Sequence, residues 1–338
     1  MKQSEDIVII GAGPAGAHCA FELAKQGIES TILDGSHPRE KPCGGGISPL
    51  IVEKFPFVNK FRSGSGTFEK FRVISPSGQT IETNLKNGFI TSRRYFDEGI
   101  LNMAVEKGAK LIKEKVIDVQ RKQEIWEVKT SERLLTARIL VGADGVNSIT
   151  RRRTIGPMSR ENLMLTYGYM AKGPEKDHAV MKILADVPGV AWVFPTENNS
   201  SIGIASELSY GSVLKRLLDD FIRLYCPPIK IVSKYAAMVP SARNPEFFAP
   251  PCAGENWALL GDAAGHADPI SGGGILYALL DGQLAAEAIR KKDLKLYDRR
   301  WREEYGGILI QRSEMRKAFY DPLVIELAFA LDAFKLRL

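Results

Sequence analysis

The glycine pattern GAGPAG at residues 11–16 constrains the fold more than any other feature of this sequence. It lies between residues 6–10, predicted as a buried strand, and residues 18–25, predicted as a helix; a second strand is predicted at residues 30–33. Such glycines allow a tight turn and a close approach of the backbone to a pyrophosphate, which the helix N-terminus attracts. Asp34 closes the second strand, where an acid accepts hydrogen bonds from an adenosine ribose. A turn that merely packs a helix on a sheet would leave this acid unexplained. The sequence predicts a dinucleotide-binding βαβ unit whose cofactor-binding residues are Gly11, Gly13, Ala15, Gly16 and Asp34.

Composition excludes several classes of protein. The chain has 338 residues, of which 44% are apolar and 25% charged, as in ordinary globular proteins. No apolar run reaches the roughly 18 to 20 residues that cross a bilayer, and the opening MKQSEDIVII is acidic where a signal peptide is basic. We therefore expect a cytoplasmic protein. The 4 cysteines are too widely spaced for the usual zinc patterns, so no metal site is expected, and the net charge of +6 is too dispersed to indicate nucleic-acid binding.

Further elements follow from periodicity and turn signals. Residues 71–75 and 80–83 flank the turn Pro76-Ser77-Gly78 and predict an antiparallel hairpin. Helices are predicted at residues 95–107, 213–224 and 274–291, and strands near residues 110–119, 125–130, 134–141 and 257. Residues 160–250 are predicted to hold mixed strands around the second of these helices.

Two further motifs identify the dinucleotide. Residues 141–148 (VGADGVNS) and 260–265 (LGDAAG) resemble the paired fingerprints of FAD-dependent hydroxylase-like flavoproteins. The resemblance implies FAD, with Asp262 against a ribityl hydroxyl, which suits a polyol that needs a fixed acceptor. Arg93 matches an arginine that begins a helix along the FAD cleft, and Val116 completes this set of predicted cofactor-binding residues. Asp144 either organises the loops near the pyrophosphate or stabilises its own turn.

The helix that opens after SGGG at residues 271–274 suits a reduced flavin. Reduced flavin carries negative charge at N1 and O2, and a helix N-terminus without side chains lets backbone N–H groups meet that charge. Gly273, Gly274 and Ile275 are therefore predicted to bind the flavin.

The segment KPCGGGIS at residues 41–48 resembles the geranylgeranyl reductase family, as do residues 262–275 and the segment GVAWVFP at residues 189–195. The family saturates double bonds of polyprenyl substrates by hydride transfer from reduced FAD. The resemblance implies that Cys43, Gly44 and Gly45 lie beside the isoalloxazine, and that Trp192, Phe194 and Pro195 shape a lipid cavity. Val190 stands where the family has tyrosine, which leaves the identity of the substrate open.

The chemistry of single residues stays open at this stage. Cys43 is either a functional thiol that donates a proton or orients the alkene or a small packing residue. His266 is either a proton relay or structural. The electron donor is NADPH or another reductant, including a donor protein. The alternatives to a reductase are an aromatic hydroxylase, a halogenase, of whose tryptophan block only a part is present, and a non-catalytic lipid-binding flavoprotein.

The predicted fold class is α/β, with a Rossmann-type FAD-binding domain interleaved with an antiparallel-sheet substrate domain. The FAD-binding domain takes residues 1–60, 86–155 and 252–295, the substrate domain residues 61–85 and 156–251, and a helical tail residues 296–338. In the tail, helical spacing gives one apolar face, and charged residues are available to the other. The apolar residues are Leu323, Leu327, Leu331, Phe334 and Leu338, and the charged ones Glu326, Lys335 and Arg337. Such a tail either packs on its own domain or makes peripheral contact with the membrane that holds a prenyl lipid.

Overall fold

The computed structural model describes residues 3–62, 70–84, 87–173, 178–196, 199–226 and 228–331. The chain forms two compact units. The first unit consists of residues 1–39, 94–162 and 240–314, and the second of residues 40–93, 163–239 and 315–338. Residues 40–60 and the end of the tail thus belong to the second unit, whereas the sequence placed both outside the substrate domain. The assignment of cofactor and substrate to separate domains stays a prediction.

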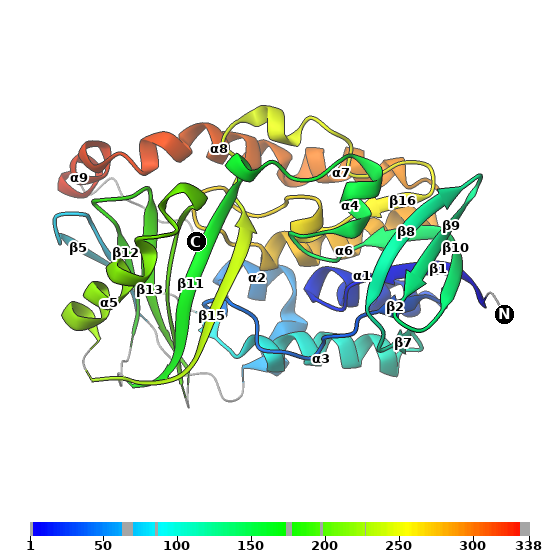
Figure 1. Ribbon diagram of the computed structural model, residues 1–338, viewed down its shortest axis with the longest axis horizontal. Coiled ribbons are helices and arrows are strands. Elements are labelled where there is room, and N and C mark those ends of the chain that lie inside the picture. Colours follow the sequence, from blue (N-terminus) through cyan, green and yellow to red (C-terminus); the bar gives the residue numbers. More distant parts are fainter. Residues whose placement is uncertain are drawn as a thin grey trace. The chain divides into compact units, whose positions relative to one another are not determined.

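The first unit is built on a mixed sheet in the order β7-β2-β1-β10-β9-β8, with β16 pairing with β10 (Figure 1). Strands β7, β2, β1, β10 and β16 run parallel, and β9 and β8 continue the sheet antiparallel. The predicted βαβ unit is confirmed. The strands are β1 (Gln3–Ile10), β2 (Thr31–Leu33), β7 (Lys110–Ile112), β8 (Val116–Lys122), β9 (Ile125–Thr130), β10 (Leu134–Gly142) and β16 (Trp257–Leu259).

Helices α1 and α6 of the first unit pack directly on each other. Gly282 makes this possible, because an added Cβ there would lie 2.8 Å from the backbone nitrogen of Cys19. His18, for which the sequence assigned no role, joins the pair through a 2.8 Å hydrogen bond between Nδ1 and the carbonyl oxygen of Leu279. The helices are α1 (Pro14–Ala24), α3 (Arg93–Glu106), α4 (Ile149–Thr154), α6 (Ile275–Arg290) and α7 (Lys295–Trp301), and α8 (Gly307–Phe319) begins in the first unit and ends in the second. Between α7 and α8 lies one π-helical stretch, Arg302–Gly306.

The second unit is built on a sheet in the order β15-β11-β14-β13-β12-β4-β5. Its pairings are antiparallel from β11 through β14 and β13 to β12, and the predicted hairpin of β4 and β5 is confirmed, although β4 joins β12 in parallel. The strands are β4 (Lys70–Ile74), β5 (Thr80–Asn84), β11 (Leu163–Lys172), β12 (His178–Ile183), β13 (Gly189–Pro195), β14 (Ser200–Glu207) and β15 (Lys230–Pro240). A small separate ladder joins β3 (Gly46–Ile47) to β6 (Phe89–Ile90), and α2 (Pro49–Lys54) follows β3.

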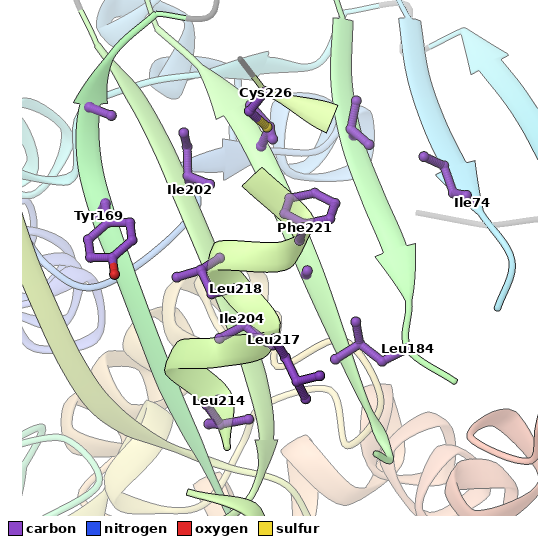
Figure 2. Packing of buried hydrophobic residues seen from close by; sticks show 14 of the residues in the cluster. Ile74, Tyr169, Leu184, Ile202, Ile204, Leu214, Leu217, Leu218, Phe221 and Cys226 are labelled. Atoms are coloured by element: carbon purple, nitrogen blue, oxygen red, sulfur yellow. The ribbon is translucent and has the colours of Figure 1, made fainter. Parts of the chain in front are cut away.

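The two faces of this sheet are covered differently. On one face, α5 (Leu214–Tyr225) buries leucines and Phe221 at positions three and four apart, the spacing of an amphipathic helix. Figure 2 shows these side chains over Ile202 and Ile204 of β14. On the other face, Ile325 and Phe329 of α9 (Pro322–Ala330) pack in a cluster with Trp192. Alternate residues of each central strand therefore enter opposite cores.

The tail differs in part from its predicted face. Ile325 and Phe329 are buried, whereas Leu323, Leu327 and Leu331 are 82%, 60% and 67% exposed. The apolar stripe that was predicted does exist, but it points to solvent. A second stripe, formed by Ile325 and Phe329, packs the helix on its own unit. Phe334, Lys335, Arg337 and Leu338 lie outside the described residues. Across the described ranges, no helix is long and apolar enough to cross a membrane.

Candidate functional site

The glycine loop after β1 is held against the end of β10. Gly11 has a φ of +102°, and an added Cβ would lie 2.2 Å from the carbonyl oxygen of Ala143. At Gly16 an added Cβ would lie 2.0 Å from the oxygen of Gly11. Gly13 is the N-cap of α1 and has no side chain to cover the first turn. The loop therefore presents bare backbone at a helix N-terminus, which fits the pyrophosphate of a dinucleotide.

Asp34, at the end of β2, is already engaged within the chain. Its carboxylate accepts hydrogen bonds from the Ala12 nitrogen at 2.9 Å, from Ser36, and from His37, whose Nδ1 lies at 2.7 Å. Burial alone would raise the pKa of Asp34, but the hydrogen bond and charge of His37 outweigh it and hold the pKa well below its usual range. A ribose hydroxyl would share this carboxylate with Ser36. The ribose contact stays a prediction.

His37 is a member of this site that the sequence analysis missed. Its Nε2 lies 3.4 Å from Asp97 on α3, so the imidazole stands between two carboxylates. Burial lowers the pKa of His37, but the hydrogen bond to Asp34 and the nearby carboxylates of Asp34 and Asp97 raise it above its ordinary value overall. The histidine comes three residues after Asp34, but only the fold brings Asp97 to it.

Val116 begins β8 close to the turn after Asp34. An added Cβ at Gly35 would lie 2.8 Å from the backbone nitrogen of Lys115, next to Val116. Val116 thus follows directly after a residue that packs on the Asp34 turn, and its contact with the cofactor stays a prediction.

The second fingerprint brings Asp262 to the start of α6. Asp262 is half-buried, and an added Cβ at Gly274 would lie 3.1 Å from its Oδ1. Gly274 is the N-cap of α6, so Gly273, Gly274 and Ile275 leave this helix end free of capping side chains. The preceding loop is fixed by Asp268, which accepts hydrogen bonds from the nitrogens of Ile270 and Ser271 at 2.9 and 2.8 Å. The arrangement suits a ribityl chain and a negatively charged flavin edge.

A buried ion pair contacts the backbone of the loop that carries Asp262. His266 and Asp281 are both 0% exposed, and Nδ1 lies 2.9 Å from Oδ2. The same carboxylate accepts a hydrogen bond from the Gly261 nitrogen at 2.7 Å and another from the Tyr305 hydroxyl. Burial alone would lower the pKa of His266, but the charge of Asp281 raises it to about 10. This closed geometry favours the structural role for His266 over a proton relay.

Asp144 and Arg151 connect the two flavin fingerprints. Asp144 accepts hydrogen bonds from the Ser148 hydroxyl and the Ile149 nitrogen, which starts α4, so it stabilises its own turn. From α4, the Arg151 guanidinium donates to the carbonyl oxygens of Ala263 and Ala264 at 3.1 and 3.2 Å. The residues present in the first unit therefore fit an extended FAD: two bare helix ends with an acid beside each.

In the second unit, the Cys43 loop rests on β13. An added Cβ at Gly44 would lie 2.1 Å from the Phe194 ring, and one at Gly45, where φ is +73°, would lie 2.1 Å from the Thr91 oxygen. The Gly45 nitrogen donates to the Cys43 sulfur at 3.4 Å. Cys43 is half-buried, whereas Cys19, Cys226 and Cys252 are buried, and all are free thiols.

The predicted substrate residues lie along this same strand. Trp192 is 8% exposed, Pro195 is buried at the strand end, and Phe194 is half-buried. The Trp192 indole donates to the Ser201 hydroxyl at 3.3 Å, and that hydroxyl donates to the carbonyl oxygen of Cys43 at 2.9 Å. The sequence analysis missed Ser201, whose neighbours in the strand give no sign of a polar partner.

Arg93, at the start of α3, is 7% exposed. Its backbone nitrogen donates to Glu40 at 2.8 Å, and the Ser92 hydroxyl binds the other oxygen of that carboxylate. Glu40 therefore fixes the start of α3. The predicted contact of the Arg93 side chain with FAD stays a prediction.

These features define an FAD-dependent oxidoreductase, and comparison with known proteins agrees. A family model described as pyridine nucleotide-disulphide oxidoreductase matches residues 5–155. Geranylgeranyl diphosphate reductase of Rhodobacter capsulatus is 28% identical over 93% of this chain and 84% of its own length. Digeranylgeranylglycerophospholipid reductase 1 of Methanopyrus kandleri is 31% identical over 89% of this chain and 86% of its own.

A solved structure extends the likeness to the whole fold. The geranylgeranyl bacteriochlorophyll reductase-like protein of Thermoplasma acidophilum superposes with a TM-score of 0.84, over 99% of this chain and 93% of that one, at 21% identity. The chain belongs to the geranylgeranyl reductase family of FAD-dependent oxidoreductases.

Proposed function

We propose that this chain saturates carbon–carbon double bonds of a long polyprenyl lipid of the geranylgeranyl type. The observation that carries the proposal is the seating of the Cys43 loop on β13, where Gly44 leaves no room for a side chain beside Phe194. Two motifs far apart in the sequence thereby meet at one place. The relatives' names, geranylgeranyl diphosphate reductase and digeranylgeranylglycerophospholipid reductase, support a prenyl substrate.

The cofactor supplies the reducing chemistry: when bound, reduced FAD donates a hydride. The first unit binds and orients it through the glycine loop at Gly11, the carboxylates of Asp34 and Asp262, and the start of α6 at Gly274. Electrons reach the flavin from NADPH or from a reduced donor protein. Neither route needs a second glycine-rich nucleotide site in this chain.

The Cys43 thiol supplies the proton that completes the reduction. Saturating a double bond adds one hydride to one carbon and one proton to the other, so a donor near the alkene is needed. Cys43 is partly exposed and accepts a hydrogen bond from Gly45, which supports the thiolate left after proton transfer. Cys43→Ala is expected to keep FAD while slowing oxidation of the reduced enzyme by substrate. Equal rates in the two proteins would leave Cys43 as a packing residue.

The protein takes up its lipid substrate at a membrane surface, which α9 contacts. Leu323, Leu327 and Leu331 form an exposed apolar stripe, and Ile325 and Phe329 hold the other side of the helix on its own unit. A bilayer matches this stripe because it also holds a polyprenyl substrate, and the exposed Lys317 near the end of α8 adds positive charge.

Anaerobic stopped-flow spectroscopy tests the proposed reaction. The FAD-loaded enzyme is reduced chemically, mixed with a geranylgeranyl lipid, and followed through the flavin absorbance. We expect rapid reoxidation by the prenyl lipid and none by a short aromatic acid. Reoxidation that needs oxygen, together with hydroxylation of a soluble phenol, would instead establish an aromatic hydroxylase. No reaction with any substrate, although the flavin binds and is reduced, would support a lipid-binding flavoprotein.

A further inference from the structure

We propose that Ser201, with Tyr235 and Trp192, is the positioning device that fixes the backbone of the Cys43 loop and so sets where the thiol stands during the reaction. The inference deepens the proposed function and rests on it. All of these residues belong to the second unit. None of them was singled out by the sequence for this role.

The Ser201 hydroxyl uses all of its hydrogen-bonding capacity. It donates its one hydrogen to the carbonyl oxygen of Cys43 at 2.9 Å. With that hydrogen on the Cys43 oxygen, the Ser201 oxygen accepts from the Trp192 indole N–H at 3.3 Å and from the Tyr235 hydroxyl at 3.0 Å, which also lies 3.5 Å from the Ile202 carbonyl oxygen. Ser201 is 2% exposed, so water does not replace these partners. A hydroxyl with three fixed partners has one orientation, and that orientation points at Cys43.

Two glycines in the sheet leave room for the Trp192 and Tyr235 side chains. Gly168 of β11 and Gly203 of β14 are paired across the sheet. An added Cβ at Gly168 would lie 2.4 Å from the Tyr235 ring, and one at Gly203 would lie 2.3 Å from the Trp192 ring. Each large side chain thus lies over a glycine. Because side chains alternate along β14, Ser201 and Gly203 face away from Ile202 and Ile204, which enter the α5 core in Figure 2.

The Cys43 loop is therefore held from two sides. Phe194 closes on Gly44, and Ser201 binds the carbonyl oxygen of Cys43 itself. Burial raises the pKa of Tyr235 above its usual value, so its hydroxyl stays a donor over the whole working range. Replacing Ser201 by alanine would leave the Cys43 carbonyl oxygen buried without a hydrogen-bond donor, which is unfavourable. The loop would then move so that this oxygen gains another partner. Loop movement shifts the thiol.

The test measures the thiol directly and needs no substrate. Cys43 is partly exposed while the other cysteines are buried, so iodoacetamide applied to the folded, FAD-loaded protein reports on Cys43. Cys43→Ala gives the blank. We expect Ser201→Ala to raise the alkylation rate about fivefold, the factor that corresponds to one hydrogen bond of typical net strength. Ser201→Thr, which keeps the hydroxyl, should restore the original rate.

Two further variants control for misfolding and for a nonspecific effect of the substitution. Tyr235→Phe keeps the ring over Gly168 and removes only the hydroxyl, so it should raise the rate in the same direction even if Ser201→Ala does not fold. Ser206→Ala is the matched control: Ser206 lies in the same strand, is 0% exposed, and donates to the carbonyl oxygen of Pro188 at 3.0 Å. Its alkylation rate should equal that of the original protein.

Turnover then separates this inference from the proposed function. With a prenyl substrate, Ser201→Ala should lower kcat about fivefold and leave KM unchanged. Unchanged alkylation in both Ser201→Ala and Tyr235→Phe would overturn the inference, whatever the substrate. Altered alkylation in a protein that reduces no prenyl lipid would overturn the proposed function and the role in catalysis, while the loop contact itself would stand.

Discussion

The two units hold their functional loops by different physics. In the first unit, the loop with Asp262 is tied down by an ion pair, His266 with Asp281, and the acid binds the Gly261 nitrogen. In the second unit, the Cys43 loop is tied down by a neutral hydroxyl, Ser201, and its partners Trp192 and Tyr235. Both supports are buried and both end on the backbone of a loop.

The two kinds of support differ in how strongly a substitution should destabilise the protein. A buried charge that loses its partner stays in a low-dielectric interior, so removing one member of the pair is far more costly than removing one neutral hydrogen bond. The charged support also responds to pH, whereas the neutral one does not.

The largest effect is expected from Asp281→Asn. The change leaves His266 buried without its counter-charge and should lower the free energy of unfolding by about 3–5 kcal/mol. Urea denaturation of the FAD-free protein measures it. Asp293→Asn is the control, because Asp293 forms an exposed pair with Arg299, and solvent screens such surface pairs so that they contribute little to stability. A loss from Asp281→Asn no larger than that of the control would remove the contrast between the units.

The next effect is a fall in stability as the pH rises. The folded pKa of His266 is about 10, above its unfolded value of roughly 6.5, so its contribution is complete below pH ~6.5 and is lost as the pH rises through about 10. We expect the free energy of unfolding to fall by about 2–4 kcal/mol across this window. Urea titrations at several pH values measure it. His266→Gln should flatten the curve, and an unchanged slope in that variant would assign the effect to another group.

A smaller effect is expected at the ribose end of the cofactor site. Asp34→Ala removes charge-assisted hydrogen bonds and should weaken FAD binding by roughly 1.5–3 kcal/mol. Flavin fluorescence titration measures the affinity, and chromatography of the released cofactor should identify FAD rather than FMN. Asp6→Ala, an exposed acid of the same unit, is the control. Equal affinities in the two variants would contradict the ribose assignment.

The smallest effect is expected on the surface of the second unit. Leu327→Ser removes a leucine that is 60% exposed and should weaken binding to liposomes by about 1 kcal/mol, since only part of the side chain enters the bilayer. Co-sedimentation with liposomes of mixed anionic and neutral lipids measures it. Leu224→Ser on α5, where the leucine is 74% exposed, should leave binding unchanged. Similar losses in both variants would mean that α9 is no specific docking surface.

Local patterns were sufficient to predict the βαβ part of the first unit. Glycines at fixed spacing, the strands beside them and the acid at residue 34 are read from contiguous sequence, and the βαβ unit was found where it was predicted. The ion pair was missed because its members lie on separate elements, although Asp281, an acid that follows the apolar first half of helix α6, was an available signal.

In the second unit, the contacts of the candidate site could not be predicted from local sequence patterns. Ser201 and Tyr235 meet because the sheet order places β11 between β14 and β15, and sheet order and register depend on the whole fold. The glycine pair at Gly168 and Gly203 appears in the sequence as two unrelated glycines. The C-terminal stripe had the right spacing, but spacing alone did not decide which of two apolar stripes would be buried.

One measurement tests the central claim that this chain is a prenyl reductase. The FAD-loaded protein is incubated without oxygen with a chemical reductant and a geranylgeranyl lipid, and the lipid is analysed by mass spectrometry. We expect a gain of two hydrogens for each double bond reduced, dependent on FAD and slowed in Cys43→Ala. A lipid recovered unchanged, from a protein that holds FAD and whose flavin is reduced, would contradict it.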